Sequence, residues 1–171
     1  MRLFILVRHG QSELNATQRI NGDPAISVGL TQQGREEAAA LAEQLAGIAL
    51  DLCLHTRFGR TRETATIALA GRDVPMEVEP GLDDIDVGEL EGRTIDDYRA
   101  WKHAHTRADA FPGGESLDAA ALRYAEAFDA LLGRTEQRLL VICHEIRNCV
   151  PHLFDEEGLR RAAARVRELA G

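Results

Sequence analysis

The sequence has few cysteines, and those present lack the spacing of a disulfide framework or a zinc site. The 171 residues include three, Cys53, Cys143 and Cys149, an odd number without close metal-type pairs. Cys53 and Cys143 lie in short apolar runs, where a free cysteine usually behaves as a small buried hydrophobe. We therefore expect neither a disulfide framework nor a bound metal.

Long hydrophobic runs are absent as well. No apolar stretch approaches the roughly 20 residues of a membrane-spanning helix, and the run near the N-terminus ends at Arg8, too early for a signal-peptide core. Hydrophobic residues make up 44% and charged residues 28% of the chain, as in a globular protein. We expect one domain over residues 1–171, located in the cytoplasm.

The sequence has fewer basic than acidic residues. Twenty Lys and Arg residues face 28 Asp and Glu residues, which gives a net charge of −8 and a pI of about 5.2. This balance argues against nucleic acid and against an anionic membrane as partners. A small anion can still bind, because charges are screened over about 8 Å at physiological salt and a few local arginines outweigh distant carboxylates.

Short apolar runs alternate with helical patterns along the chain, which predicts an α/β fold with a mostly parallel central sheet. The expected strands are residues 3–7, 50–55, 76–79, 138–143 and about 149–154. The expected helices are residues 31–46, 58–69, 94–104, 116–132 and 156–169, with Thr31 and Asp155 as caps. The connection over residues 11–30 is long enough to be a candidate functional loop.

Polar residues follow two of the expected strands directly. Arg8, His9 and Gly10 follow the first strand, and His144 follows the strand over residues 138–143. Ligands of open α/β sheets bind at the carboxyl ends of the strands, so the two histidines can meet across a crevice. The guanidinium of Arg8 matches a phosphate, a neutral ring nitrogen of His9 can attack phosphorus, and Gly10 lets the backbone approach a ligand.

The stretch Arg8-His9-Gly10-Gln11-Ser12-Glu13-Leu14-Asn15 resembles the signature of the histidine phosphatase superfamily. Arg8, His9, Gly10, Ser12 and Asn15 match it by identity. The resemblance implies the phosphoglycerate-mutase-like fold, a three-layer α/β/α sandwich with a mostly parallel sheet. It also implies hydrolysis of a phosphomonoester through a phosphohistidine on His9, without metal or other cofactor.

Further site residues are implied by the same resemblance. Arg60 begins Arg60-Thr61-Arg62-Glu63-Thr64-Ala65, which is similar to the family's arginine followed four residues later by threonine and alanine. It is expected in the first turn of a helix, where backbone N–H groups also favour an anion. Arg8, Arg60 and His144 would hold the phosphoryl oxygens, with Asn15 and Ser12 assisting.

The proton donor is the least defined residue of this set. In the family an acid, usually glutamate, stands four residues before a glycine; counting back from Gly88 gives Asp84. A donor must come within hydrogen-bond reach of the ester oxygen, and aspartate is one methylene shorter than glutamate. Asp83 and Asp86 are alternatives.

The chain departs from the family pattern after His144. Relatives carry a helix there, whereas this sequence reaches its last expected strand almost at once, and Pro151 disfavours a helix. Either the protein is trimmed at this point or a segment is missing from the sequence. Glu145, in place of the commoner glycine, adds a negative charge beside His144.

Three functions remain open on these grounds. Hydrolysis of a small-molecule phosphate ester is favoured, because a phosphoglycerate-type mutase must protect its phosphoenzyme from water with longer covering segments. The third is a non-catalytic protein that binds a phosphorylated ligand, motivated by Asp84, Glu145 and the missing helix. The sequence does not identify the ester, and it allows a homodimer.

Overall fold

The computed structural model of this chain describes residues 2–144 and 148–170, so Glu145 lies outside the described residues. Within these ranges a central sheet has the strand order β3-β2-β4-β1-β5. The strands are β1 (Leu3–Arg8), β2 (Leu52–His55), β3 (Met76–Val78), β4 (Arg138–Cys143) and β5 (His152–Phe154). The first four are mutually parallel and β5 pairs antiparallel with β1, which confirms the mostly parallel sheet.

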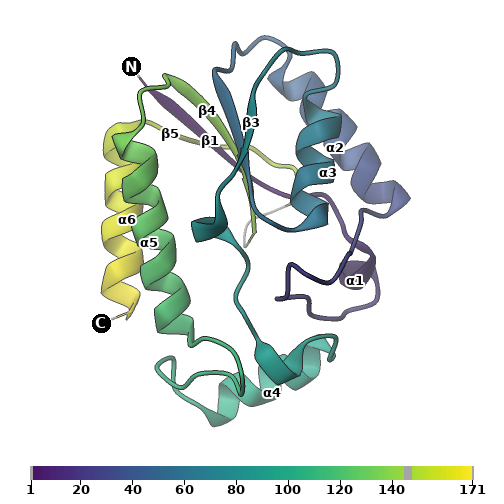
Figure 1. The fold of residues 1–171 in the computed structure, drawn as a ribbon, viewed down its shortest axis with the longest axis vertical. Coiled ribbons are helices and arrows are strands. Elements are labelled where there is room, and N and C mark those ends of the chain that lie inside the picture. Colours follow the sequence, from purple (N-terminus) through teal and green to yellow (C-terminus); the bar gives the residue numbers. More distant parts are fainter. Residues whose placement is uncertain (1, 145–147, 171) are drawn as a thin grey trace.

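Helices cover both faces of the sheet and make the three expected layers (Figure 1). On one face lie α2 (Gln32–Leu45) and α3 (Gly59–Ala68), and on the other lie α5 (Leu117–Gly133) and α6 (Glu156–Ala170). The expected helices all form, and their ends differ from the prediction by at most one residue. Thr31 caps α2 by accepting a hydrogen bond from the backbone of Gly34, and Asp155 accepts one from Gly158 at the start of α6.

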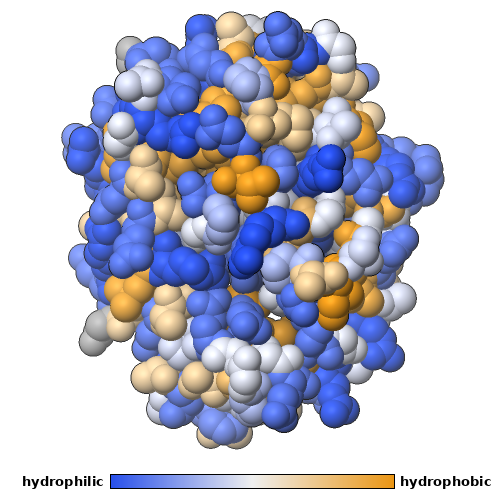
Figure 2. All heavy atoms as spheres, in the orientation of Figure 1, coloured by the Kyte–Doolittle hydropathy of each residue, from blue (hydrophilic) through white to orange (hydrophobic). Residues whose placement is uncertain are grey.

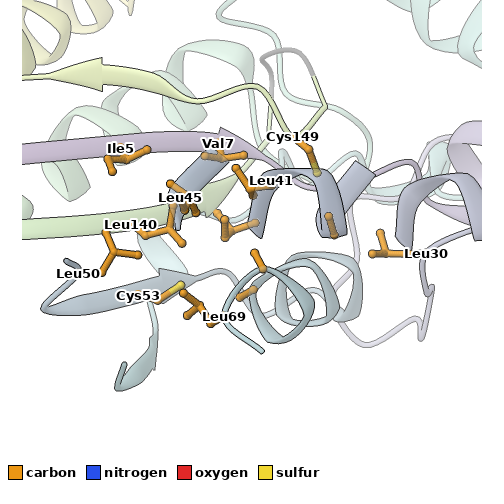
Figure 3. Packing of buried hydrophobic residues seen from close by; sticks show 14 residues of the cluster. Ile5, Val7, Leu30, Leu41, Leu45, Leu50, Cys53, Leu69, Leu140 and Cys149 are labelled. Carbon is orange, nitrogen blue, oxygen red and sulfur yellow. The ribbon is translucent and has the colours of Figure 1, made fainter. Parts of the chain in front are cut away.

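The three central strands β1, β2 and β4 bury both faces because their side chains alternate between two apolar clusters. Ile5 and Val7 of β1 point to the face of α2 and α3, where they join Leu41, Leu45 and Leu140 (Figure 3). The intervening residues of β1 point the other way and pack against α5 and α6; this second cluster includes Phe4, Leu6, Val141, Leu131 and Leu159. Strands buried on both faces read as continuous apolar runs, which is why the sequence predicts them well.

A smaller unit covers the carboxyl ends of the strands. It contains the short turns η1 (Pro80–Leu82) and η2 (Gly88–Leu90) and the helix α4 (Ile95–Ala104), which lies well away from the sheet (Figure 1). Its own apolar cluster centres on Val87 and Phe111, against which Tyr98 and Trp101 pack. This cluster places the acidic segment before η2 over the ends of β1, β2 and β4.

Two expected segments differ in detail from the structure. The connection over residues 11–30 contains a short helix, α1 (Glu13–Ala16), which a capping box between Ser12 and Asn15 starts. The last strand begins only at His152, because Pro151 cannot donate to a ladder and Cys149 turns the chain at a φ of 48°. Among the described residues 148–151 there is no helix between β4 and β5.

Gly10 also has a structural role, which the sequence does not predict. A Cβ atom at this position would lie 2.4 Å from the carbonyl oxygen of Gly34, in the first turn of α2. The missing side chain therefore lets two backbones touch, and this contact by itself requires a glycine.

The face shown in Figure 2 is mainly hydrophilic, with apolar residues in small groups. No helix in the described part of the chain has the length and apolar character needed to cross a bilayer. Cys53, Cys143 and Cys149 are all buried and unpaired, as expected of small hydrophobes, and burial raises the pKa of each thiol to about 12.

Candidate active site

The two histidines that follow neighbouring strands meet at the end of the sheet. His9 follows β1 and His144 follows β4, and the parallel pairing of Arg8 with Cys143 puts them at the same level. Their ring centroids are 5.2 Å apart, and only 1% of His9 and 6% of His144 is exposed. The juxtaposition expected from the sequence is thus present.

His9 is held in one tautomer. Its Nδ1 lies 2.7 Å from the carbonyl oxygen of Gly10, which can only accept, so Nδ1 carries the hydrogen and Nε2 the lone pair. Nε2 accepts a hydrogen bond of 3.0 Å from Nε of Arg60. Burial, followed by the charges of His144 and Arg60, holds the pKa of His9 well below its ordinary value, so the ring is neutral.

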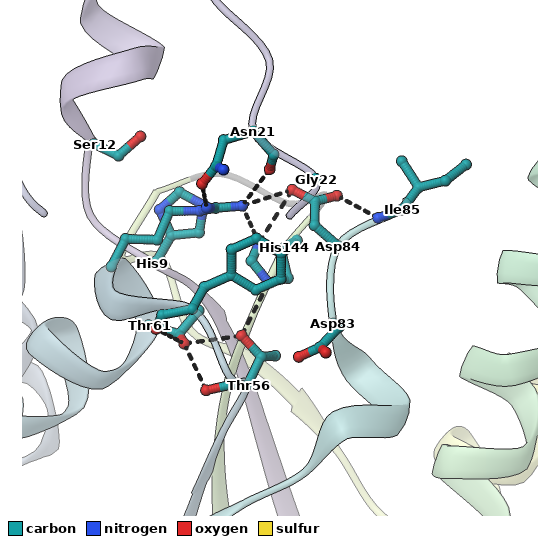
Figure 4. A network of polar contacts seen from close by, with 12 residues as sticks. His9, Ser12, Asn21, Gly22, Thr56, Thr61, Asp83, Asp84, Ile85 and His144 are labelled. Atoms are coloured by element: carbon teal, nitrogen blue, oxygen red, sulfur yellow. Dashed lines mark hydrogen bonds and ion pairs between the residues drawn. The ribbon is translucent and has the colours of Figure 1, made fainter. Parts of the chain in front are cut away.

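Arg60 connects most of the site, because it contacts His9, Asn21, Asp84 and His144, the residues labelled at the centre of Figure 4. It lies in the first turn of α3, 2% exposed, with its guanidinium over the ring of Phe58 at 4.2 Å. Besides His9, the guanidinium donates to the side-chain and backbone oxygens of Asn21 and to Oδ2 of Asp84, the last at 2.9 Å. A buried guanidinium with partners on three sides is well placed to bind an oxyanion.

His144 presents its two nitrogens to different surroundings. Nδ1 faces the site, 3.3 Å from both Oδ2 of Asp84 and Nη2 of Arg60, whereas Nε2 lies 3.1 Å from the hydroxyl of Thr56. Burial, with smaller contributions from Arg60 and Arg8, holds the pKa of His144 well below its ordinary value.

The three acidic candidates are separated by the structure. Asp84 reaches Arg60 and His144, and its other oxygen accepts from the backbone of Ile85. Asp83 turns away to bind the backbone and the guanidinium of Arg57 (Figure 4). Asp86 is exposed and accepts from the backbone of Gly88. Of the three, Asp84 is the carboxyl group brought into contact with both a histidine and an arginine of the site.

The remaining expected residues line a small cavity of about 110 Å³ beside the histidines. Arg8 lines it together with Ser12 and Asn15. Ser12 and Asn15 bind one another through the capping box of α1, so each fixes the other's position. All seven residues expected from the sequence therefore gather at one end of the sheet.

Asn21 and Arg19 also belong to the cavity wall, and the sequence does not predict them. Asn21 is 7% exposed and binds Arg60 and Glu91, and Arg19 lines the same cavity from the connection after α1. Both lie in the long loop over residues 11–30, whose length was the one available signal. No group of three or more His, Cys, Asp or Glu side chains in the described ranges has an arrangement that could hold a metal ion.

A larger cavity of about 550 Å³ opens on the other side of Asp84. Its charged lining includes Asp23, Asp86 and Glu91. It also includes two ion pairs, Arg57 with Asp83 and Arg123 with Glu115. Acidic side chains thus outnumber basic ones around this cavity, whereas the small cavity next to the histidines is rich in arginine.

Curated relatives of this chain are named as phosphoglycerate mutases. The probable phosphoglycerate mutase GpmB of Erwinia tasmaniensis is 31% identical over 147 residues, which cover 81% of this chain and 67% of that protein. The 2,3-bisphosphoglycerate-dependent phosphoglycerate mutase of Parvibaculum lavamentivorans is 34% identical over 161 residues, 83% of this chain and 74% of that protein.

Solved structures similar to this chain include phosphatases. The alpha-ribazole phosphatase from Shigella flexneri gives a TM-score of 0.73 at 28% identity, covering 84% of this chain and 74% of that one. A mycobacterial glucosyl-3-phosphoglycerate phosphatase gives 0.74 over 99% of this chain and 86% of that one, and at 21% identity it supports the fold alone. A sequence model of the histidine phosphatase superfamily (branch 1) matches residues 4–166. The chain belongs to the histidine phosphatase superfamily.

Proposed function

We propose that this protein hydrolyses a small phosphomonoester through a phosphohistidine on His9, without a metal. The observation that carries the proposal is the neutral, buried ring of His9, whose Nε2 lone pair accepts from Arg60, a residue that lines the arginine-rich cavity. A neutral imidazole with a fixed tautomer is a competent nucleophile. The positive charge that phosphoryl transfer needs comes from Arg8 and Arg60.

In the first step Nε2 of His9 attacks phosphorus in line with the ester oxygen. The N–P bond forms while the P–O bond to the leaving alcohol breaks, and the electron pair of that bond stays on the oxygen. Asp84, as the carboxylic acid, gives this oxygen its proton. The contacts of Asp84 with Arg60 and His144 put its carboxyl group beside the phosphoryl site.

In the second step a water molecule attacks phosphorus opposite His9. The N–P bond breaks and its electron pair returns to Nε2, while the carboxylate of Asp84 takes the proton of the water. Inorganic phosphate leaves, and both residues are back in their starting forms. Arg8, Arg60 and His144 hold the three equatorial oxygens throughout, and Asn15, fixed by Ser12, assists from the cavity wall.

A phosphoglycerate-type mutase is the second candidate, because curated relatives carry that name. The larger cavity beside Asp84 argues against it. The alcohol released from phosphoglycerate is glycerate, which carries a carboxylate, and the cavity that would receive it is lined by more acidic than basic side chains. Hydrolysis of an ester with an uncharged leaving group fits this lining better.

The test measures release of inorganic phosphate from p-nitrophenyl phosphate with EDTA present, for the wild type and His9→Ala. Turnover that survives EDTA and vanishes in His9→Ala supports the proposal. Equal turnover in both proteins means that His9 is not the nucleophile. Phosphate binding without turnover indicates a non-catalytic protein, and interconversion of 2- and 3-phosphoglycerate in a parallel assay indicates the mutase.

A further inference from the structure

His144 has a buried hydroxyl partner on the side that faces away from the phosphoryl site. Thr56 follows β2, is 1% exposed, and lies with its Oγ1 3.1 Å from Nε2 of His144 (Figure 4). The same Oγ1 lies 2.9 Å from the hydroxyl of Thr61, in the first turn of α3. The three side chains form a chain of hydrogen bonds that leads from α3 to the site.

Counting hydrogens fixes the direction of this chain. The hydroxyl of Thr61 has one hydrogen, and it donates it to a backbone carbonyl, either that of Phe58 at 2.8 Å or that of Thr56 at 3.2 Å. Thr61 can therefore only accept from Thr56. The single hydrogen of the Thr56 hydroxyl is then used, so Thr56 accepts from Nε2 of His144, which must carry a hydrogen.

The other nitrogen of His144 consequently has the lone pair when the ring is neutral. Nδ1 faces the guanidinium of Arg60 and the carboxyl group of Asp84, each at 3.3 Å. Burial and the surrounding cations keep the ring neutral, because the pKa of His144 is held well below its ordinary value. The ionisable groups that face it are Arg8 at the end of β1, His9 directly after it, Arg60 from α3, Arg123 from α5, and Asp84.

We propose that Thr56 and Thr61 are positioning residues that hold the hydrogen of neutral His144 on Nε2 and leave Nδ1 as an acceptor. The second half of the inference rests on the proposed function. Nδ1 can donate to a phosphoryl oxygen only after it gains a proton, from the substrate monoanion or from solution. The bound phosphoryl group then faces an imidazolium ion, whose positive charge adds to that of the arginines.

The first test reads the hydrogen position directly and needs no turnover. In protein labelled with ¹⁵N-histidine, the two ring nitrogens of neutral His144 have distinct shifts, and His144→Gln identifies them. We expect the hydrogen on Nε2 in the wild type and in Thr56→Ser. In Thr56→Val the partner of Nε2 is lost, so the hydrogen moves to Nδ1, where Asp84 accepts it. A wild-type ring with its hydrogen on Nδ1 overturns the proposal.

Thr61→Val provides a second test. Thr61 does not bind His144 itself and reaches it only through the hydroxyl of Thr56. Without Thr61 as acceptor, the hydroxyl of Thr56 can donate to Nε2, so the hydrogen again moves to Nδ1, and Thr61→Ser restores the wild-type form. Thr66→Val is the matched control, since Thr66 is an exposed residue of α3 whose hydroxyl donates to the carbonyl of Arg62. If His144 keeps its hydrogen on Nε2 in Thr61→Val, the proposed chain of hydrogen bonds from Thr61 through Thr56 to His144 is contradicted.

The kinetic test uses p-nitrophenyl phosphate, whose good leaving group needs no acid. Uptake of one proton makes wild-type kcat/KM fall about tenfold per pH unit on the alkaline side. In Thr56→Val the hydrogen of His144 is already on Nδ1, so kcat/KM of this variant should fall clearly less steeply with pH. The pH dependence of Thr56→Ser should match that of the wild type. Unchanged slopes with an altered NMR tautomer would overturn the proton-uptake step and leave the tautomer assignment intact. Absence of turnover in the wild type would instead refute the proposed function.

Discussion

Nε of Arg60 donates a 3.0 Å hydrogen bond to Nε2 of His9, the nitrogen that carries the lone pair. In the proposed mechanism the in-line attack on phosphorus needs this lone pair, so Arg60 exchanges Nε2 of His9 for a phosphoryl oxygen when a substrate binds. The exchange keeps the guanidinium satisfied, because Asn21 and Asp84 hold its other nitrogens. The proposal thus gives Arg60 two partners in turn, His9 in the resting protein and the phosphoryl group in the complex.

Arg60→Ala should lower kcat/KM for phosphate esters by about a hundredfold or more, as expected for loss of a donor that stabilises transition-state charge. Arg62→Ala is the matched control, because Arg62 is an exposed residue on the same helix. Steady-state phosphate release from both variants measures the difference. A comparable loss of kcat/KM in both variants would contradict a specific role of Arg60 in stabilising the transition state.

Asp84→Asn should slow esters of poor leaving groups much more than p-nitrophenyl phosphate, since only an alkyl alkoxide needs a proton as it leaves. Asp83→Asn removes the partner of Arg57 and should affect both substrate types alike. The ratio of the rates for an alkyl phosphate and p-nitrophenyl phosphate is the measurement. A collapse of this ratio in Asp83→Asn or Asp86→Asn, and not in Asp84→Asn, would reassign the proton donor.

Folding stability should decrease as the pH falls below about 6.5, the ordinary pKa of histidine. The pKa values of His9 and His144 are lowered by folding, so below 6.5 the unfolded chain binds protons that the folded chain does not. Each residue should contribute up to about 1.4 kcal/mol per pH unit. Urea unfolding across mildly acidic pH should give a shallower dependence for His144→Gln. Replacement of the exposed His103 serves as the control.

Gly10→Ala should destabilise the fold by about 1–3 kcal/mol, because the new Cβ would lie 2.4 Å from the backbone oxygen of Gly34 and force the backbones apart. Gly47→Ala is the comparison, since no atom lies within 4 Å of a Cβ placed there. Chemical denaturation of both variants measures the free energy of unfolding. Equal stabilities would show that the loop after β1 can move away from α2 without cost.

The sequence predicts the parts of this molecule that depend on local pattern. Strands buried on both faces appear as apolar runs, and a polar residue directly after such a run marks the carboxyl edge of the sheet. His9 and His144 are found this way, and Arg60 through a motif near the start of a helix. The choice among Asp83, Asp84 and Asp86 needs the structure, because neighbouring side chains point in different directions. Asp83 pairs with Arg57, whereas Asp84 pairs with Arg60.

Local sequence patterns do not predict contacts between segments that are distant in the sequence. Asn21 has no special neighbours in the sequence, yet it binds Arg60, 39 residues away, and Glu91, 70 residues away. Thr56 reads as an ordinary hydroxyl residue after a strand, and only the approach of β4 to β2 brings it to His144. Both positions follow from the order of strands in the sheet, which a single sequence does not specify.

The most direct test of the account is to trap the phosphoenzyme. Wild-type enzyme mixed with a ³²P-labelled phosphomonoester and quenched in alkali should carry label that acid removes and alkali does not, and peptide mapping should locate it at His9. The label should be absent from His9→Ala. Label on another residue, or steady turnover with no label during rapid sampling, would contradict a phosphohistidine mechanism at His9.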